Sequence, residues 1–160
     1  MYKLLIVDDE EIEREGMAHF IPWEEQGIQL VGTAWNGVQG LEMMERLRPD
    51  IVLVDVKMPV MSGLEMIRQA RQTFPDVVYV ILSGYGEYEF TSQAMEEGVR
   101  HYLLKPCDEK RIREVLDKVK AELSERQAQA SKDRDARVLL PHAREQIFCD
   151  LVLDRAQVGS

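Results

Sequence analysis

Five short apolar runs alternate with helical segments, and this alternation is the feature that most constrains the fold. The runs cover residues 3–7, 28–34, 51–54, 77–82 and 101–104. Each has the length of a strand and is apolar almost throughout, as strands buried on both faces are. Because a helical segment follows each of the first four runs, successive strands are expected to be parallel, with right-handed crossovers. The sequence therefore predicts a doubly wound α/β fold with a five-stranded parallel sheet.

The helical segments between these runs carry their own signals. Helices are expected up to about residue 20, over 39–47, after Ser62, over about 86–97 and from about residue 108. Ser62 is followed three residues later by Glu65, which is the pattern of a capping box at the start of a helix. Pro49 is expected to stop the second helix, because proline cannot continue a helix.

Polar side chains follow four of the five apolar runs. Asp8 and Asp9 follow the first run, Asp55 the third, Ser83 the fourth and Lys105 the fifth. The carboxyl ends of parallel strands meet at one edge of a sheet, where doubly wound proteins bind their ligands. An isolated buried charge is costly, so a carboxylate at the end of a buried strand indicates a functional site.

The residue types at this edge are suited to phosphoryl transfer. Three converging carboxylates would repel one another, and Mg²⁺ favours such oxygen ligands. Lys105 and Ser83 would supply a positive charge and a hydroxyl to a further, anionic group. Phosphoryl transfer requires this kind of positioning and charge neutralisation, and a carboxylate can be its nucleophile. Asp55, after the buried third run, is the candidate nucleophile.

These motifs together resemble the receiver domain of bacterial two-component response regulators. The resemblance covers roughly the first 120 residues and lies in Asp8-Asp9, Asp55 with the loop Met58-Pro59 to Gly63, Ser83, and Tyr102 to Pro106. The loop over 22–27, Asn36-Gly37 and the stretch from Ser83 to Tyr88 are most similar to regulators that carry an AraC-type DNA-binding output domain. The resemblance implies a flavodoxin-like fold with strand order 2-1-3-4-5.

The resemblance also implies roles for individual residues. Asp55 would be the phosphoacceptor, and Mg²⁺ would be held by Asp9, Asp55, the backbone carbonyl of Lys57 and, through water, Asp8. Lys105 and Ser83 would contact the phosphoryl group. Ser83 and Tyr102 would form the switch pair, with serine where threonine is commoner. The Lys105–Pro106 peptide bond would be cis.

By the same resemblance, the chain is a signalling module rather than an enzyme. A sensor histidine kinase would donate the phosphoryl group, and phosphorylation would favour a homodimer and switch a transcriptional output domain. The alternative is a phosphorylation-independent pseudo-receiver. A phosphatase of the haloacid dehalogenase type would need an acid two residues after Asp55, where Lys57 stands, and the P-loop motif of nucleotide-binding enzymes is absent.

Simpler structural readings remain open for single residues. Asp8-Asp9 is also a plausible cap of the first helix. Ser83-Gly84 is also compatible with a simple turn, and Tyr102 with a half-buried strand aromatic.

Composition limits the partners. The formal net charge is −9, from 29 acidic and 20 basic residues, which argues against nucleic acid or an anionic membrane as a direct partner of this chain. No apolar run has the length of a transmembrane helix. Cys107 and Cys149 lie far apart without a CxxC motif, as expected for two reduced thiols in a cytoplasmic protein.

The last quarter of the sequence is expected to be separate from the receiver domain. The domain is assigned to residues 1–123, and residues 124–160 to a helical linker and the start of a following segment. Residues 124–137 are polar with mixed charges, so a solvated helical extension and a flexible linker both fit. Apolar residues return at 138–140 and 147–152.

Overall fold

One parallel sheet organises the structure. A computed structural model describes residues 1–139, with side chains described for residues 1–130. Its elements are β1 (Tyr2–Val7), α1 (Glu11–Phe20), the 3₁₀ helix η1 (Trp23–Gln26), β2 (Ile28–Ala34), α2 (Gly37–Leu47), β3 (Ile51–Asp55), α3 (Gly63–Thr73), β4 (Val78–Ser83), α4 (Tyr88–Glu96), β5 (His101–Leu104) and α5 (Glu109–Leu139). The strand order is β2-β1-β3-β4-β5, which confirms the predicted fold class and strand order.

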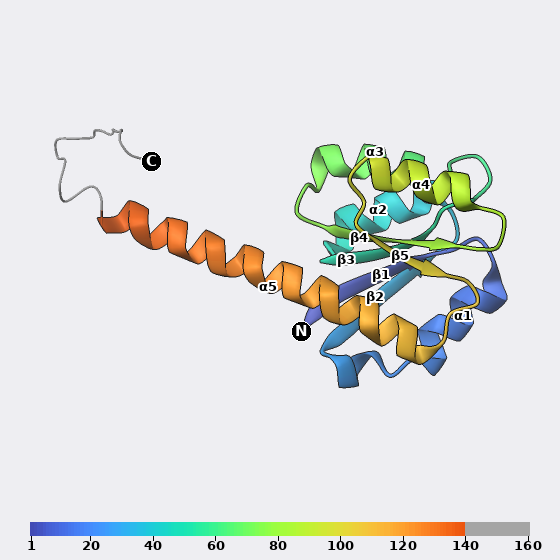
Figure 1. The fold of residues 1–160 in the computed structure, drawn as a ribbon, viewed down its shortest axis with the longest axis horizontal. Helices are drawn as coiled ribbons and strands as arrows, with labels where there is room; N and C mark the ends of the chain where they lie inside the picture. The colour runs from blue at the N-terminus through green and yellow to red at the C-terminus, as the bar shows by residue number, and fades with distance from the viewer. Residues whose placement is uncertain (140–160) are drawn as a thin grey trace. The chain divides into compact units, whose positions relative to one another are not determined.

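Helices cover both faces of the sheet. α2, α3 and α4 lie on one face, and α1 and the first turns of α5 lie on the other (Figure 1). Side chains alternate between the faces along each strand, so Leu5 and Val7 of β1 join Val52 and Val54 of β3 in the core under α2 to α4. Burial of one such side chain stabilises the fold by about 1.5–3 kcal/mol.

Two helix boundaries differ from the sequence prediction. α4 begins at Tyr88 rather than Gly86, because Gly86 has a φ of 82°, which a right-handed helix does not allow. α2 begins at Gly37 rather than residue 39, because the Asn36 side chain accepts a hydrogen bond from the Gln39 amide and caps the helix. The predicted capping box of α3 is present between Ser62 and Glu65.

The helix α5 continues to Leu139. The chain divides into two compact units, Met1–Lys120 and a second that begins at Ala121. Of the two readings of residues 124–137, the helical one is found, because α5 continues to Leu139. The predicted apolar segments at residues 140 and 147–152, and Cys149, lie outside the described residues, and Cys107 is a free thiol. None of the helices that the structure describes is long and apolar enough to cross a membrane.

Gly63, the first residue of α3, closes the loop that follows β3. Its amide donates to the carbonyl of Val56 at 3.0 Å. A Cβ atom at this position would collide with the backbone carbonyl oxygen of Asp55 and lie 2.9 Å from the carbonyl carbon. Only glycine allows α3 to approach the end of β3 this closely.

The Gly63→Ala substitution is therefore expected to lower the free energy of unfolding by about 1–3 kcal/mol, because the backbone of β3 must shift. Gly16→Ala is the matched control: Gly16 lies within α1, and a Cβ there meets nothing within 4 Å. That control is expected to stabilise the protein by about 0.5–1 kcal/mol. Urea unfolding of both variants checks this, and equal stability of Gly63→Ala and the wild type would contradict it.

Candidate functional site

The carboxyl edge of the sheet contains a pocket that gathers most of the predicted site residues. The pocket has a volume of about 620 Å³. Asp55 is the last residue of β3, Asp9 lies in the turn after β1, and Lys105 and Pro106 directly follow β5. Lys57 also lines the pocket. The parallel sheet thus brings together residues that are up to 97 positions apart.

Asp55 is a buried carboxylate at the end of β3. It is only 3% exposed. Its Oδ2 lies 3.2 Å from the Lys105 ammonium, and its Oδ1 accepts a 3.4 Å hydrogen bond from the Lys57 amide. Burial raises the pKa of Asp55 to about 7, with a contribution from repulsion by Asp8, although Lys105 acts in the opposite direction.

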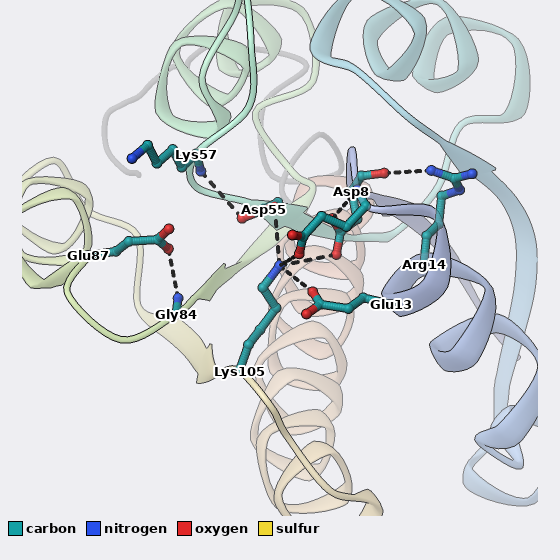
Figure 2. A network of polar contacts seen from close by, with 9 residues as sticks. Asp8, Glu13, Arg14, Asp55, Lys57, Gly84, Glu87 and Lys105 are labelled. Atoms are coloured by element: carbon teal, nitrogen blue, oxygen red, sulfur yellow. Dashed lines mark hydrogen bonds and ion pairs between the residues drawn. The ribbon is translucent and has the colours of Figure 1, made fainter.

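The Lys105 ammonium lies among four carboxylates (Figure 2). Nζ is 2.6 Å from Glu13, 3.2 Å from Asp55, and 3.4 Å from both Asp8 and Glu10. Burial would lower the pKa of Lys105, but the ion pairs with these carboxylates outweigh it and raise the pKa above its ordinary value. Lys105 therefore carries a positive charge inside the pocket.

Backbone contacts fix the turn between β1 and α1. Asp8 is fully buried, and its Oδ1 accepts a hydrogen bond from the Glu10 amide at 2.9 Å. The guanidinium of Arg14 donates to the backbone carbonyl of Asp8, also at 2.9 Å. Arg14 itself is buried, and its guanidinium lies 5.8 Å from the ring centroid of Trp35. The turn that presents Asp8 and Asp9 is thus held from inside the fold.

Three carboxylates have the geometry of a site for a hard cation. Oxygen atoms of Asp8, Asp9 and Asp55 all lie within 4.8 Å of one another. The single positive charge of Lys105 does not balance the negative charges of these three aspartates and of Glu10 and Glu13. An all-oxygen donor set that keeps excess negative charge fits Mg²⁺ in both ligand type and electrostatics.

The structure places Ser83 and Tyr102 at a second cavity. This cavity has a volume of about 750 Å³, and Tyr88 and Met95 of α4 also line it. Ser83 is buried, whereas Tyr102 is 41% exposed. Neither lines the pocket of Asp55, but Gly84 lines both cavities. The structure therefore does not bring the predicted switch pair into the same pocket as Asp55.

The turn after β5 connects Lys105 to Ser83. The Lys105 amide donates to the Ser83 carbonyl at 2.6 Å, and the Lys105–Pro106 peptide bond is cis.

Four further residues contact this edge of the sheet and are not among the site residues predicted from the sequence. Glu10 and Glu13 pair with Lys105, Arg14 holds the Asp8 carbonyl, and the Glu87 carboxylate accepts from the Gly84 amide. The spacing of Glu10 and Glu13 puts both on one face of a helix start, directly after Asp9, and this signal was available. The contacts of Arg14 and Glu87 depend on loop geometry and leave no pattern in the sequence.

Comparison with known proteins identifies the family. Residues 4–117 match the model of the response regulator receiver domain. The transcriptional regulatory protein YesN of Bacillus subtilis is 44% identical over 144 residues, which are 90% of this chain and 39% of YesN. The transcriptional regulatory protein HptR of Staphylococcus aureus is 33% identical over 129 residues, 81% of this chain and 50% of HptR. The chain thus spans half or less of the length of these two relatives.

Solved structures agree with this comparison. The receiver domain of the response regulator AraT from Geobacillus stearothermophilus is 40% identical, with a TM-score of 0.74 over 79% of this chain and 98% of that domain. A two-component transcriptional regulator AraC from Clostridium phytofermentans is 28% identical, with a TM-score of 0.74 over 80% of this chain and 99% of the solved chain. The fold, the site and these relatives together show that the chain belongs to the receiver domain family of two-component response regulators.

Proposed function

We propose that Asp55 accepts a phosphoryl group from a phosphohistidine of a sensor histidine kinase, in a reaction that requires Mg²⁺. Phosphorylation then switches the activity of a DNA-binding transcriptional output domain in a longer protein. This segment has a net charge of −9 and is not proposed to bind nucleic acid itself. The names of the relatives as transcriptional regulators support the proposed output.

The observation that carries the proposal is the environment of the Asp55 carboxylate. It is 3% exposed, yet it opens on a pocket and lies 3.2 Å from a lysine ammonium and near two further aspartates. A carboxylate held in this way is expensive for stability alone, because burial opposes its charge. Its position is suited to nucleophilic attack on an electrophile that enters from the pocket.

The proposed metal ligands are Asp9, Asp55 and the Lys57 carbonyl, with Asp8 acting through water. Bound Mg²⁺ would neutralise charge on the phosphoryl oxygens. In this arrangement Asp55 would be both a ligand of the ion and the phosphoacceptor.

The transfer exchanges one bond to phosphorus for another. An oxygen of Asp55 forms the new P–O bond while the P–N bond to the donor imidazole breaks, and the imidazole keeps the electron pair. Lys105 would balance charge on the phosphoryl group, and Ser83 would donate its hydroxyl to it. Tyr102 would follow Ser83 as the second member of the switch. The chain would thus promote its own phosphorylation and dephosphorylation without being an enzyme for another substrate.

The proposed organisation assigns residues 1–123 to the receiver domain and residues 124–160 to a helical linker and the start of a following segment. The proposed location is the cytoplasm, where a histidine kinase would meet this chain.

We expect Asp55→Asn to reduce phosphoryl labelling to background. Labelling with acetyl phosphate and Mg²⁺, or with a phosphorylated kinase, should add one phosphoryl group that hydroxylamine removes, as an acyl phosphate requires. Intact mass measures it. Asp117→Asn is the control, because the Asp117 side chain is 66% exposed and pairs with Lys120 at 3.6 Å, away from the pocket of Asp55.

Full labelling of Asp55→Asn would show that another residue is the phosphoacceptor. Absence of labelling in both the wild type and Asp117→Asn would favour the phosphorylation-independent pseudo-receiver instead.

Asp9→Ala is expected to weaken Mg²⁺ binding at least about tenfold, because it removes one of few direct oxygen ligands. Calorimetric titration measures the affinity without any phosphodonor. Glu11→Ala removes the same charge in the first turn of α1 but lies outside the aspartate cluster, and its affinity should stay within about twofold of the wild type. Equal affinities of the two variants would mean that Asp9 is not a ligand.

We also propose that phosphorylation favours a symmetric homodimer through the face of α4 and β5. Exposed apolar side chains gather there: Tyr88, Phe90 and Met95 of α4 and Tyr102 and Leu104 of β5 are 40–80% exposed. An apolar patch of this kind on a water-soluble domain indicates an interaction site.

The dimer is tested by sedimentation of the 160-residue chain with and without Mg²⁺ and beryllofluoride, a mimic of the phosphoryl group. The mass should double with beryllofluoride, and Leu104→Glu should stay monomeric because it puts a charge into the apolar contact. Phe20→Glu changes a side chain that is 83% exposed at the end of α1 and should dimerise like the wild type. A wild-type chain that stays monomeric in both states at high concentration would contradict the proposal.

A further inference from the structure

The loop between β4 and α4 is closed by a turn over residues 84–87, here called the Gly84–Glu87 turn. The Glu87 amide donates to the Gly84 carbonyl at 3.3 Å. In return, the Gly84 amide donates to the Glu87 carboxylate at 2.7 Å (Figure 2). Gly86 is the third residue of the turn and has a φ of 82°, which glycine adopts freely. Both the backbone and the side chain of Glu87 therefore engage Gly84.

This turn lies at the pocket of the phosphoacceptor. Gly84 and Glu87 line the same pocket as Asp55 and Lys105. Asp55 is paired with Leu82 across the sheet, and the Lys105 amide bonds the Ser83 carbonyl, so Gly84 emerges from β4 between the acceptor and the lysine. Gly84 thus lines the pocket that a group attached to Asp55 would enter.

The Glu87 side chain does not cap the helix that it precedes. Glu87 is the N-cap residue of α4, yet its side chain makes no capping hydrogen bond to the helix. It turns instead into a pocket that already contains the carboxylates of Asp9 and Asp55. Like charges repel at such a site, so the charge-assisted bond to the Gly84 amide must offset this cost.

A carboxylate oxygen and a phosphoryl oxygen make the same kind of contact with a backbone amide. Gly84 offers one N–H, and in this structure Glu87 takes it. A phosphoryl group on Asp55 would bring further negative charge into the pocket that Glu87 lines, so the two anions would compete for the same donor.

We propose that the Glu87 carboxylate is an internal competitor of the phosphoryl group for the Gly84 amide, and that phosphorylation expels it from the pocket. This proposal rests on the proposed role of Asp55 and adds the regulation of that site. While Glu87 holds the amide, the pocket binds anions weakly. When the phosphoryl group takes the amide, the Gly84–Glu87 turn opens and the start of α4 is released.

Beryllofluoride with Mg²⁺ is the probe, titrated against the 160-residue chain. Glu87→Ala should bind it about tenfold more tightly than the wild type, because no charge-assisted hydrogen bond must be broken. Glu87→Gln keeps a neutral oxygen that accepts from the Gly84 amide, so its gain should be smaller than that of Glu87→Ala. Glu89→Ala is the control. It removes an exposed charge two residues further along, in the first turn of α4, and should bind beryllofluoride like the wild type.

NMR spectroscopy tests the hydrogen bond between the Gly84 amide and the Glu87 carboxylate directly. In the absence of beryllofluoride, the amide proton resonance of Gly84 should move upfield in Glu87→Ala and stay in place in Glu89→Ala. Addition of beryllofluoride to the wild type should break the contact, so that the Glu87 side-chain carboxyl resonance moves toward its position in water.

The outcomes separate this proposal from the proposed function. If the wild type and Glu89→Ala bind beryllofluoride and Glu87→Ala binds no more tightly, the competition is wrong while the role of Asp55 stands. Equal gains in beryllofluoride affinity for Glu87→Ala and Glu87→Gln would show that only the charge of Glu87 matters. That result would also overturn the proposed competition for the Gly84 amide. If neither the wild type nor Glu89→Ala binds beryllofluoride, the function and the competition fail together.

Discussion

The ammonium group of Lys105 is the interaction on which the site depends. It lies within 3.4 Å of four carboxylates that come from the end of β1, the start of α1 and the end of β3. Without it, the buried Asp8 and Asp55 would have no ion pair with any other side chain that the structure describes, a situation that costs several kcal/mol per ion. With it, the cluster still carries more negative than positive charge. The site is thus compensated in part and keeps an excess of negative charge, which suits the proposed binding of a cation.

The sheet supplies the geometry that this interaction needs. Val7 pairs with Val54, and Asp55 pairs with Leu82, so the ends of β1, β3 and β4 stand at the same level. A shift of one residue in any strand would turn its polar end to the opposite face of the sheet. Gly63 holds the start of α3 against the Asp55 backbone, and Arg14 holds the Asp8 carbonyl. The side chains of the candidate site therefore lie at the strand ends or in the turns directly after them, where these contacts hold the backbone.

The sequence predicts most of this arrangement because the decisive signals are local. Each strand is a run of apolar residues, and each site aspartate follows such a run, so the parallel topology alone brings Asp8, Asp9, Asp55 and Lys105 together. The start of α4 lies two residues later than predicted, because the spacing of apolar residues carries no information about the positive φ of Gly86.

The contacts of Arg14 and Glu87 could not be predicted at all. They join a side chain to a backbone group whose position is set only by the folded loops. Residue type and spacing carry no information about such a contact, whereas they do for the ion pair of Lys105 with the strand-end aspartates.

The loop after β4 links the chemistry at Asp55 to the face of α4. Gly84 lines both the acceptor pocket and the cavity of Ser83 and Tyr102, so a change at this residue alters both spaces. The far end of α4 is anchored to α3, because Arg68 pairs with the Glu97 carboxylate and Arg71 donates to the Glu97 carbonyl at 2.6 Å.

The near end of α4 is attached through the Gly84–Glu87 turn. A ligand shifts a conformational equilibrium only through contacts that differ between its two states. If phosphorylation changes the contact at Gly84 as proposed, the first turn of α4 would move, and the exposed aromatic residues on it would move with it. The Glu97 end of α4 would stay held by its contacts with Arg68 and Arg71.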